Sequence, residues 1–224
     1  MLHIVSTPIG NLDDMSHRAV DVLRAADVII AEDSRRTYIL SNRYGLGAKK
    51  VIPYNEANEK AQLPKIIELL KQGNEVALTT DAGTPGISDP GFLIVREAVK
   101  ENIKISPVPG PCAFISALVC SGLPCEKFIF EGFIPKKPGQ KESLLKKIKE
   151  NNVTSIFYES PHRISKTLAD LAAIMPDRNI VIARELTKRH EEFARGTAKE
   201  VFKHFKEQIV KGEIVVIVDR KPKE

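Results

Sequence analysis

The first half of the chain alternates short apolar runs with stretches whose apolar residues recur at helical spacing. Residues 28–31 and 76–78 are continuous apolar runs with the length of buried strands, whereas 92–99 has the spacing of a helix that faces a core. Alternating strands and helices joined by short turns predict a parallel sheet with helices on both faces. We expect strands at 2–6, 28–31, 51–52, 76–78 and 103–108, and helices around 19–26, 38–40, 66–70, 92–99 and 112–120.

The pattern changes around residue 121, where we place a domain boundary. Residues 127–133 alternate polar and apolar side chains, which predicts a strand that ends in a basic loop at 135–141. The sequence thus predicts two α/β domains, residues 1–121 and 122–224. In the second domain we expect a helix through 144–148 and strands at 155–158, 180–183 and 214–218, with helices between them.

The loop at residues 79–91 carries the strongest functional signal. It holds three glycines, two prolines and two aspartates between a predicted strand and a predicted helix. Glycine has no Cβ, so such a loop can bring its backbone close to a ligand. Ligands of open α/β sheets lie outside the carboxyl ends of the strands, and we therefore interpret this loop as a ligand loop. The alternative is a tight surface turn.

Three further polar segments follow predicted strands of the first domain, at residues 8–11, 32–36 and 109–111. Together with the glycine-rich loop, these segments should lie at the same edge of the parallel sheet. The Gly-x-Gly-x-x-Gly fingerprint of dinucleotide sites is missing after the first strand, and no P-loop motif is present. A cofactor held mainly by backbone groups, without a phosphate cradle, fits these loops better.

The charge of the chain lies unevenly along it. The 224 residues carry a formal net charge of +5, with 42% hydrophobic and 28% charged residues, as is ordinary for a soluble globular protein. Residues 1–121 hold 13 basic and 14 acidic side chains, whereas 122–224 hold 21 and 15. The second half therefore looks suited to a polyanion, and the alternative is a solvated, lysine-rich surface.

Cysteine and histidine usage points to a cytoplasmic protein without a structural metal site. The three cysteines form no Cys-x-x-Cys pair, and the five histidines are scattered. The N-terminus lacks the basic and apolar regions of a signal peptide, and no apolar run is long enough to cross a bilayer.

Two clusters in the second half combine carboxylates with histidine and arginine. They occupy 157–163 and 183–192, each at the end of a predicted strand. One such cluster could be a set of surface ion pairs. Two of them favour a shared substrate surface, although His162 and His190 are individually weak candidates.

Six of these motifs, in order along the chain, resemble the tetrapyrrole methylase superfamily. The motifs are STPIGNL at 6–12, AEDSR at 31–35, DAGTPGISDPG at 81–91, PGP at 109–111, YESPHR at 158–163 and RELTK at 184–188. Within that superfamily they are similar to the branch that methylates small-subunit ribosomal RNA. The resemblance implies two α/β domains, with a parallel sheet in the first, a mixed sheet in the second and S-adenosylmethionine (SAM) in the cleft between them.

The same resemblance implies a homodimer that methylates the 2′-hydroxyl of a cytidine in the decoding region of the RNA. A ribose hydroxyl needs to lose its proton, so a carboxylate or histidine is the expected base. Glu32 and three other carboxylates are candidates, and the sequence does not choose among them. We take Asp33, Glu159 and Glu185 as the candidate catalytic residues.

The remaining expected contacts divide between the cofactor and the RNA. The residues expected at the cofactor are Pro8, Gly10, Asp81, Ala82, Gly83, Thr84, Ile87, Cys112, Ala113, Phe157 and Ala183. The residues expected at the RNA are Arg35, Arg36, Lys136, Lys137, Lys141, His162, Arg163, Arg184 and His190.

Two rival functions stay open at this point. One is methylation of a small tetrapyrrole by the same fold, which would prefer a neutral, apolar substrate site. The other is a non-catalytic RNA-binding factor in ribosome assembly, against which the intact loop at 81–91 argues.

Overall fold

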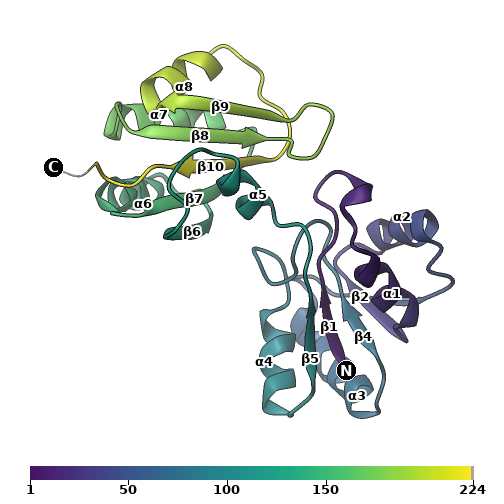
Figure 1. Cartoon of the computed structure of the whole chain (residues 1–224). Coiled ribbons are helices and arrows are strands. Elements are labelled where there is room, and N and C mark those ends of the chain that lie inside the picture. Colours follow the sequence, from purple (N-terminus) through teal and green to yellow (C-terminus); the bar gives the residue numbers. More distant parts are fainter. Residues whose placement is uncertain (223–224) are drawn as a thin grey trace. The chain divides into compact units, whose positions relative to one another are not determined.

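In a computed structural model, which describes residues 1–222, the chain folds into two compact units. The first unit spans Met1–Cys112 and the second begins at Ala113 (Figure 1). Each unit has its own five-stranded sheet and its own core. Within the described residues, none of the helices is both long and apolar enough to cross a membrane.

The sheet of the first unit is parallel throughout, as the alternating sequence pattern predicted. Its strand order is β3-β2-β4-β1-β5. The carboxyl ends of its strands consequently meet at one edge, which places the loops after them side by side. The strands are β1 (Leu2–Val5), β2 (Val28–Ala31), β3 (Lys50–Pro53), β4 (Val76–Leu78) and β5 (Ile105–Val108).

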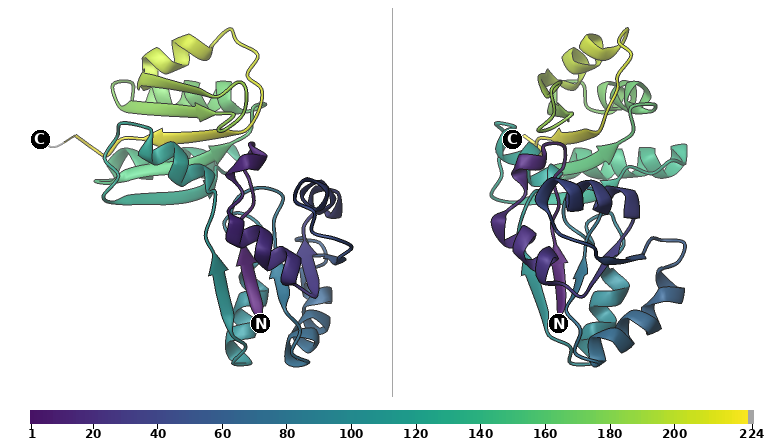
Figure 2. Two further views of the ribbon diagram at one scale, coloured as in Figure 1. Left: turned by 45° about the vertical axis from the view of Figure 1, so that its right-hand side comes forward. Right: turned by 90° about the vertical axis from the view of Figure 1, so that its right-hand side faces the viewer.

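Helices cover both faces of this sheet, as Figure 2 shows. On one face α1 packs Ala19 and Leu23 against the strands, and on the other α3 and α4 bury Ile66 and Ile94. The helices are α1 (His17–Ala25), α2 (Ser34–Tyr44), α3 (Glu59–Lys71) and α4 (Phe92–Lys100), with a short 3₁₀ helix, η1, at Leu12–Asp14.

The second sheet is mixed, in agreement with the expected fold class. Its order is β6-β7-β10-β8-β9, where β6 and β7 are parallel and the other neighbours are antiparallel. The sequence pattern missed β9, because this edge strand carries charged residues and a glycine where a buried strand would be apolar. The strands are β6 (Phe128–Phe133), β7 (Thr154–Glu159), β8 (Asn179–Arg184), β9 (Glu192–Thr197) and β10 (Ile214–Val218).

Three helices cover one face of the second sheet and a short one lies on the other. The first face packs against α6 (Pro138–Glu150), α7 (Ile164–Ile174) and α8 (Ala198–Phe205). On the opposite face lies α5 (Ala113–Val119), which contacts β7 and β10. The Arg195 guanidinium from β9 donates to the carbonyls of Cys120 at 2.7 Å and Ser121 at 3.2 Å, just after α5.

Two boundaries differ from those expected. Because α5 packs on the second sheet, the units divide at 112/113, nine residues before the boundary placed at 121/122. The expected loop at 135–141 is also shorter, because α6 already begins at Pro138. Proline is favoured in the first turn of a helix, where its fixed φ suits the helix and its missing N–H leaves no bond unmade.

Candidate active site

The loops after β1, β4 and β5 are tied to one another at the carboxyl edge of the first sheet. The backbones of Thr7 and Gly83 exchange two hydrogen bonds, of 2.8 and 3.0 Å. The Thr84 hydroxyl donates to the carbonyl of Pro111 at 3.1 Å and accepts from the Ser6 hydroxyl at 2.9 Å. Residues about 80 positions apart in the chain thus form one rigid group of loops at this edge.

Two glycines make this close approach feasible. Gly83 is buried and has φ of +86°, and a Cβ there would point between Ile9 and the carbonyl of Pro111, at 3.5 and 3.8 Å. A Cβ on Gly110 would lie 2.9 Å from the Cβ of Ser6, closer than two carbons tolerate. A side chain at position 110 would therefore separate the loops, whereas at position 83 the positive φ is what favours glycine.

The other expected cofactor residues lie in or directly after these loops. In the loop after β1, Pro8 is buried and Gly10 is exposed. In the loop after β4, Asp81 and Ile87 are exposed and Ala82 is half-buried. Cys112 and Ala113 are both half-buried and stand where the two units divide.

Three carboxylates gather at the same edge. Burial and, to a smaller extent, the negative charges of Glu32 and Asp81 raise the pKa of Asp89 to about 6, against a hydrogen bond from Thr80 that lowers it. Burial and the charge of Asp81 also raise the pKa of Glu32, whose side chain accepts from the Thr80 hydroxyl at 3.2 Å. Sequence reasoning missed Asp89 as a titrating group, although it lies in the loop that carried the strongest signal.

This edge fits SAM better than it fits a phosphate-bearing cofactor. SAM carries a cationic sulfonium and presents hydroxyls and an amine, all of which carboxylates can bind, whereas phosphates would be repelled. The glycine at position 83, where a side chain would fill the space between Ile9 and Pro111, is consistent with a ligand held by backbone.

Asp33 caps the N-terminus of α2, and its neighbours bind its side chain and its backbone. Its carboxylate accepts from the backbone N–H of Arg35 at 2.9 Å and pairs with the Arg35 guanidinium at 2.6 Å. Hydrogen bonds from Arg35 lower the pKa of Asp33 to about 2, and its N–H donates to Asp81 at 3.1 Å. A carboxylate so stabilised is a weak base, whereas Arg35 and Arg36 are exposed and accessible to an anion.

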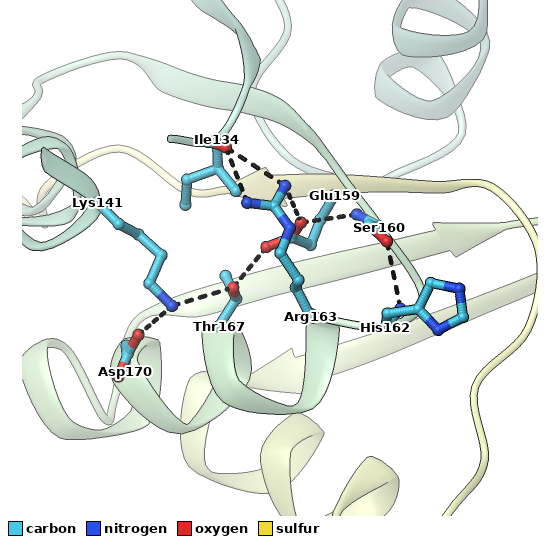
Figure 3. A network of polar contacts seen from close by, with 8 residues as sticks. All are labelled: Ile134, Lys141, Glu159, Ser160, His162, Arg163, Thr167 and Asp170. Atoms are coloured by element: carbon cyan, nitrogen blue, oxygen red, sulfur yellow. Dashed lines mark hydrogen bonds and ion pairs between the residues drawn. The ribbon is translucent and has the colours of Figure 1, made fainter. Parts of the chain in front are cut away.

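Glu159, at the end of β7, lies within the protein in a charged network (Figure 3). Its side chain is fully buried and forms an ion pair with Arg163 at 2.6 Å. It also accepts from the Ser160 N–H at 2.7 Å and from the Thr167 hydroxyl at 2.6 Å. Arg163 in turn donates to the carbonyl of Ile134 at 3.3 Å. This geometry gives Glu159 the role of an internal anchor, without access to a substrate proton.

The network continues to Lys141, which we expected among the residues that contact the RNA. Lys141 lies on the inward side of α6, is 8% exposed and pairs with Asp170 at 2.5 Å. Its ammonium also lies 3.5 Å from the Thr167 hydroxyl (Figure 3). Because α6 begins before this residue, Lys141 is turned toward α7, and the structure separates it from the exposed Lys136 and Lys137.

Glu185 stabilises the loop between β8 and β9. Its carboxylate accepts from the Lys188 ammonium at 2.8 Å and from the Glu213 N–H at 3.1 Å, and the bond from Lys188 lowers its pKa. Arg184 pairs with Glu192 at 2.7 Å across the same pair of strands. These ion pairs hold the loop, which leaves His190 exposed at its tip.

Phe157 and Ala183 occupy opposite faces of the second sheet. Phe157 is fully buried in the core under α6, α7 and α8. Ala183 and Tyr158 both pair with Val215 in the sheet register, so they share the face that carries α5. The aromatic residue of β7 that shares a face with Ala183 is therefore Tyr158, and the run of apolar residues in β7 did not distinguish it from Phe157.

Comparison with known proteins gives consistent matches over nearly the whole chain. The family model described as Tetrapyrrole (Corrin/Porphyrin) Methylases matches residues 1–201. A protein of Thermotoga maritima named Ribosomal RNA small subunit methyltransferase I is 47% identical over 220 residues, covering 98% of each chain. A protein of the same name from Bacillus subtilis is 42% identical over 98% of this chain and 75% of its own length.

Solved structures match in fold at low sequence identity. A diphthine synthase has a TM-score of 0.73 and 17% identity, covering 100% of this chain and 91% of its own. The methyltransferase CobJ has a TM-score of 0.71 and 19% identity, covering 98% and 93%.

Proposed function

The chain belongs to the tetrapyrrole methylase family, and from this premise we propose that it methylates the 2′-hydroxyl of a cytidine in the decoding region of small-subunit ribosomal RNA. The observation that carries the proposal is the 47% identity, over 98% of both chains, to a protein named Ribosomal RNA small subunit methyltransferase I. We further propose that the protein acts in the cytoplasm and, as the resemblance implies, as a homodimer.

SAM is the methyl donor of this family, and when bound it supplies a methyl group activated by an adjacent positive sulfur. The joined loops of the first unit would hold it, through Pro8, Gly10, Gly83 and Thr84. The carboxylates of Glu32, Asp81 and Asp89 would favour a cationic ligand at this edge.

The RNA would meet the exposed basic side chains. Arginine matches phosphate in a two-pronged hydrogen bond, and lysine supplies a point charge. The exposed members of the expected set are Arg35, Arg36, Lys136, Lys137, His162 and His190. This supports a polyanionic substrate over a small tetrapyrrole.

The three carboxylates expected as bases, Asp33, Glu159 and Glu185, are better suited to holding their neighbours in place than to taking a proton from the ribose. Asp33 is held as a weak base by Arg35, and Glu185 by Lys188. Glu159 is buried beneath Arg163. Asp89, with its pKa raised to about 6, has the basicity that suits a general base near neutral pH. Orientation of the ribose hydroxyl and the methyl group would supply most of the rate.

The test is a methyl-transfer assay on small ribosomal subunits from a strain that lacks this gene. Purified protein and methyl-labelled SAM should place label on a cytidine ribose, and that position should resist alkaline cleavage because its 2′-oxygen is blocked. Subunits from the parent strain, already methylated, should accept no label. Label on a base, label only on a tetrapyrrole offered in a parallel reaction, or no transfer would contradict the proposal.

A further inference from the structure

Phe133 is an aromatic side chain exposed on a rigid element. It ends β6 and is 59% exposed. Its ring makes a T-shaped contact with Tyr158, at 5.3 Å between centroids. A large apolar ring in water costs free energy, so an exposed ring on an ordered strand is more informative than one in a loose loop.

A β-bulge places this ring opposite Tyr158, on the same face of the sheet. The register between β6 and β7 shifts between Phe130 and Phe133, and Gly132 there has φ of +68°. Bulges of this kind redirect the side chain that follows, and they require a residue that tolerates positive φ. Without the bulge, the alternation along β6 would continue unbroken to the end of the strand.

The residue after Phe133, Ile134, is held by burial of its side chain and by hydrogen bonds of its N–H and its carbonyl. Ile134 is 1% exposed, and its N–H donates to the carbonyl of Tyr158 at 3.1 Å. Its own carbonyl accepts from Arg163, which is paired with the fully buried Glu159 (Figure 3). The buried network therefore holds the backbone from which the exposed ring projects.

Exposed basic side chains follow this ring closely in the chain and also follow the end of the neighbouring strand. Lys136 and Lys137 follow three and four residues later and are exposed, and His162 is exposed in the loop after the neighbouring parallel strand β7. Figure 3 shows the His162 ring directed away from the network that ties its loop to Ile134. An aromatic platform flanked by cations is the arrangement that binds single-stranded nucleic acid, because bases stack on the ring while phosphates meet the cations.

We propose that Phe133 is a stacking platform for an unpaired base of the RNA substrate, with Lys136 and Lys137 on the adjacent phosphates. This inference rests on the proposed function, which supplies the RNA. Duplex RNA keeps its bases stacked inside the helix, so the surface should select single strands. The charge of Lys136 and Lys137 favours RNA over a second copy of this basic chain as the occupant.

The experiment uses the fact that the chain contains no tryptophan. The variant Phe133→Trp keeps a stacking ring and introduces a single fluorophore, and its emission should be quenched by a short single-stranded oligocytidylate and not by a duplex of equal length. Phe92, in α4 of the first unit, is 66% exposed and provides the matched control. Phe92→Trp should report no binding.

Affinity measurements complete the test. Phe133→Ala should weaken binding of the oligocytidylate and raise KM for small subunits by about 5- to 100-fold. The salt dependence of RNA binding should stay unchanged, because no phosphate contact is lost. Phe133→Leu should recover only part of the loss, since it restores apolar contact without a ring. Phe92→Ala should bind as the parent does.

Four outcomes would overturn the inference. RNA affinity unchanged in Phe133→Ala would show that no base stacks there, while RNA binding by the parent protein would leave the proposed function standing. Weaker SAM binding with unchanged RNA affinity would make Phe133 part of the cofactor site, and a change of oligomeric state by sedimentation would make it a contact between copies. Absence of RNA binding by the parent protein would overturn both proposals.

Discussion

Carboxylates that look alike in the sequence have different chemistry in this protein, because their immediate neighbours differ. Asp33 and Glu185 each accept a hydrogen bond from a cation, which lowers their pKa. Burial, together with the charges of neighbouring carboxylates, raises the pKa of Asp89 to about 6. The sequence places all three in loops that follow strands, but only the surroundings in the folded protein decide which can take a proton near neutral pH.

The raised pKa of Asp89 makes a prediction about stability. An aspartate in an unfolded chain has a pKa of about 3.9, so between there and about 6 the folded protein holds more protons than the unfolded one. The free energy of unfolding should therefore fall as pH rises through this window and level off above it. Asp89→Asn removes that loss and should stabilise the protein by about 1 to 2 kcal/mol at pH 7, after screening by water.

Urea unfolding followed by circular dichroism, between about pH 4 and pH 7, measures this effect. The difference between Asp89→Asn and the parent should grow with pH. Asp177→Asn, at an exposed aspartate between α7 and β8, is the control and should leave the pH dependence unchanged. If the free energy of unfolding varied with pH in the same way for the parent protein and Asp89→Asn, the pKa of Asp89 would not be raised in the folded state.

At the scale of elements, the sequence predicted the parts whose apolar pattern is strong. Every strand of the first sheet was expected, and β10 was expected at its observed bounds of Ile214–Val218. The edge strand β9 was missed because only one of its faces packs on the core under α6, α7 and α8. Phe193 and Arg195 lie on the other face, which carries α5. Its formation depends on pairing with β8 and on the Arg195 contacts that follow α5, which are long-range and leave no local pattern.

The candidate site was predictable to the same extent. The loops at the carboxyl edge of the first sheet were expected to lie together, because parallel topology alone dictates that edge. The burial of Lys141 and Glu159 was not predictable, since it depends on how α6 and α7 pack on β7. Helix phase fixes which lysines of a basic stretch face water, and the start of α6 at Pro138 was the missing information.

The glycines of the loop after β4 permit a test of its role. Gly83 and Gly86 have nearly the same backbone angle, φ of +86° and +83°, so an alanine strains both positions alike. Only at Gly83 would the new methyl group enter the space between Ile9 and Pro111, whereas nothing lies within 4 Å at Gly86. Gly83→Ala should weaken SAM binding by about tenfold or more, and Gly86→Ala by much less.

Calorimetric titration with SAM on both variants measures the difference, with thermal unfolding as a check that each is folded. Equal losses would mean that backbone strain alone is responsible and that Gly83 holds no ligand. Unchanged affinity in a folded Gly83→Ala protein would remove this loop from the cofactor site.

At the scale of the whole molecule, charge and chemistry are divided between the two units. Residues 113–121 carry no charge, so the excess of 21 basic over 15 acidic side chains belongs to the second unit wherever the boundary is drawn. The first unit, with 13 basic and 14 acidic residues, presents carboxylates at its ligand edge. This division suits a cationic cofactor on the first unit and a polyanionic substrate on the second.

The division predicts that the two ligands respond differently to the loss of lysines. Each phosphate contact releases counterions, so the slope of log affinity against log salt reports their number. Lys136→Ala with Lys137→Ala should make the slope for RNA shallower by about 0.7 to 0.9 for each lost contact. SAM affinity should not change. The control pair Lys60→Ala with Lys65→Ala removes the same charge from exposed positions on α3 of the first unit. Equal slopes for the two double variants would mean that Lys136 and Lys137 contribute only through the net charge of the protein. A shallower slope for the Lys136→Ala, Lys137→Ala variant alone would indicate that these lysines contact RNA phosphates.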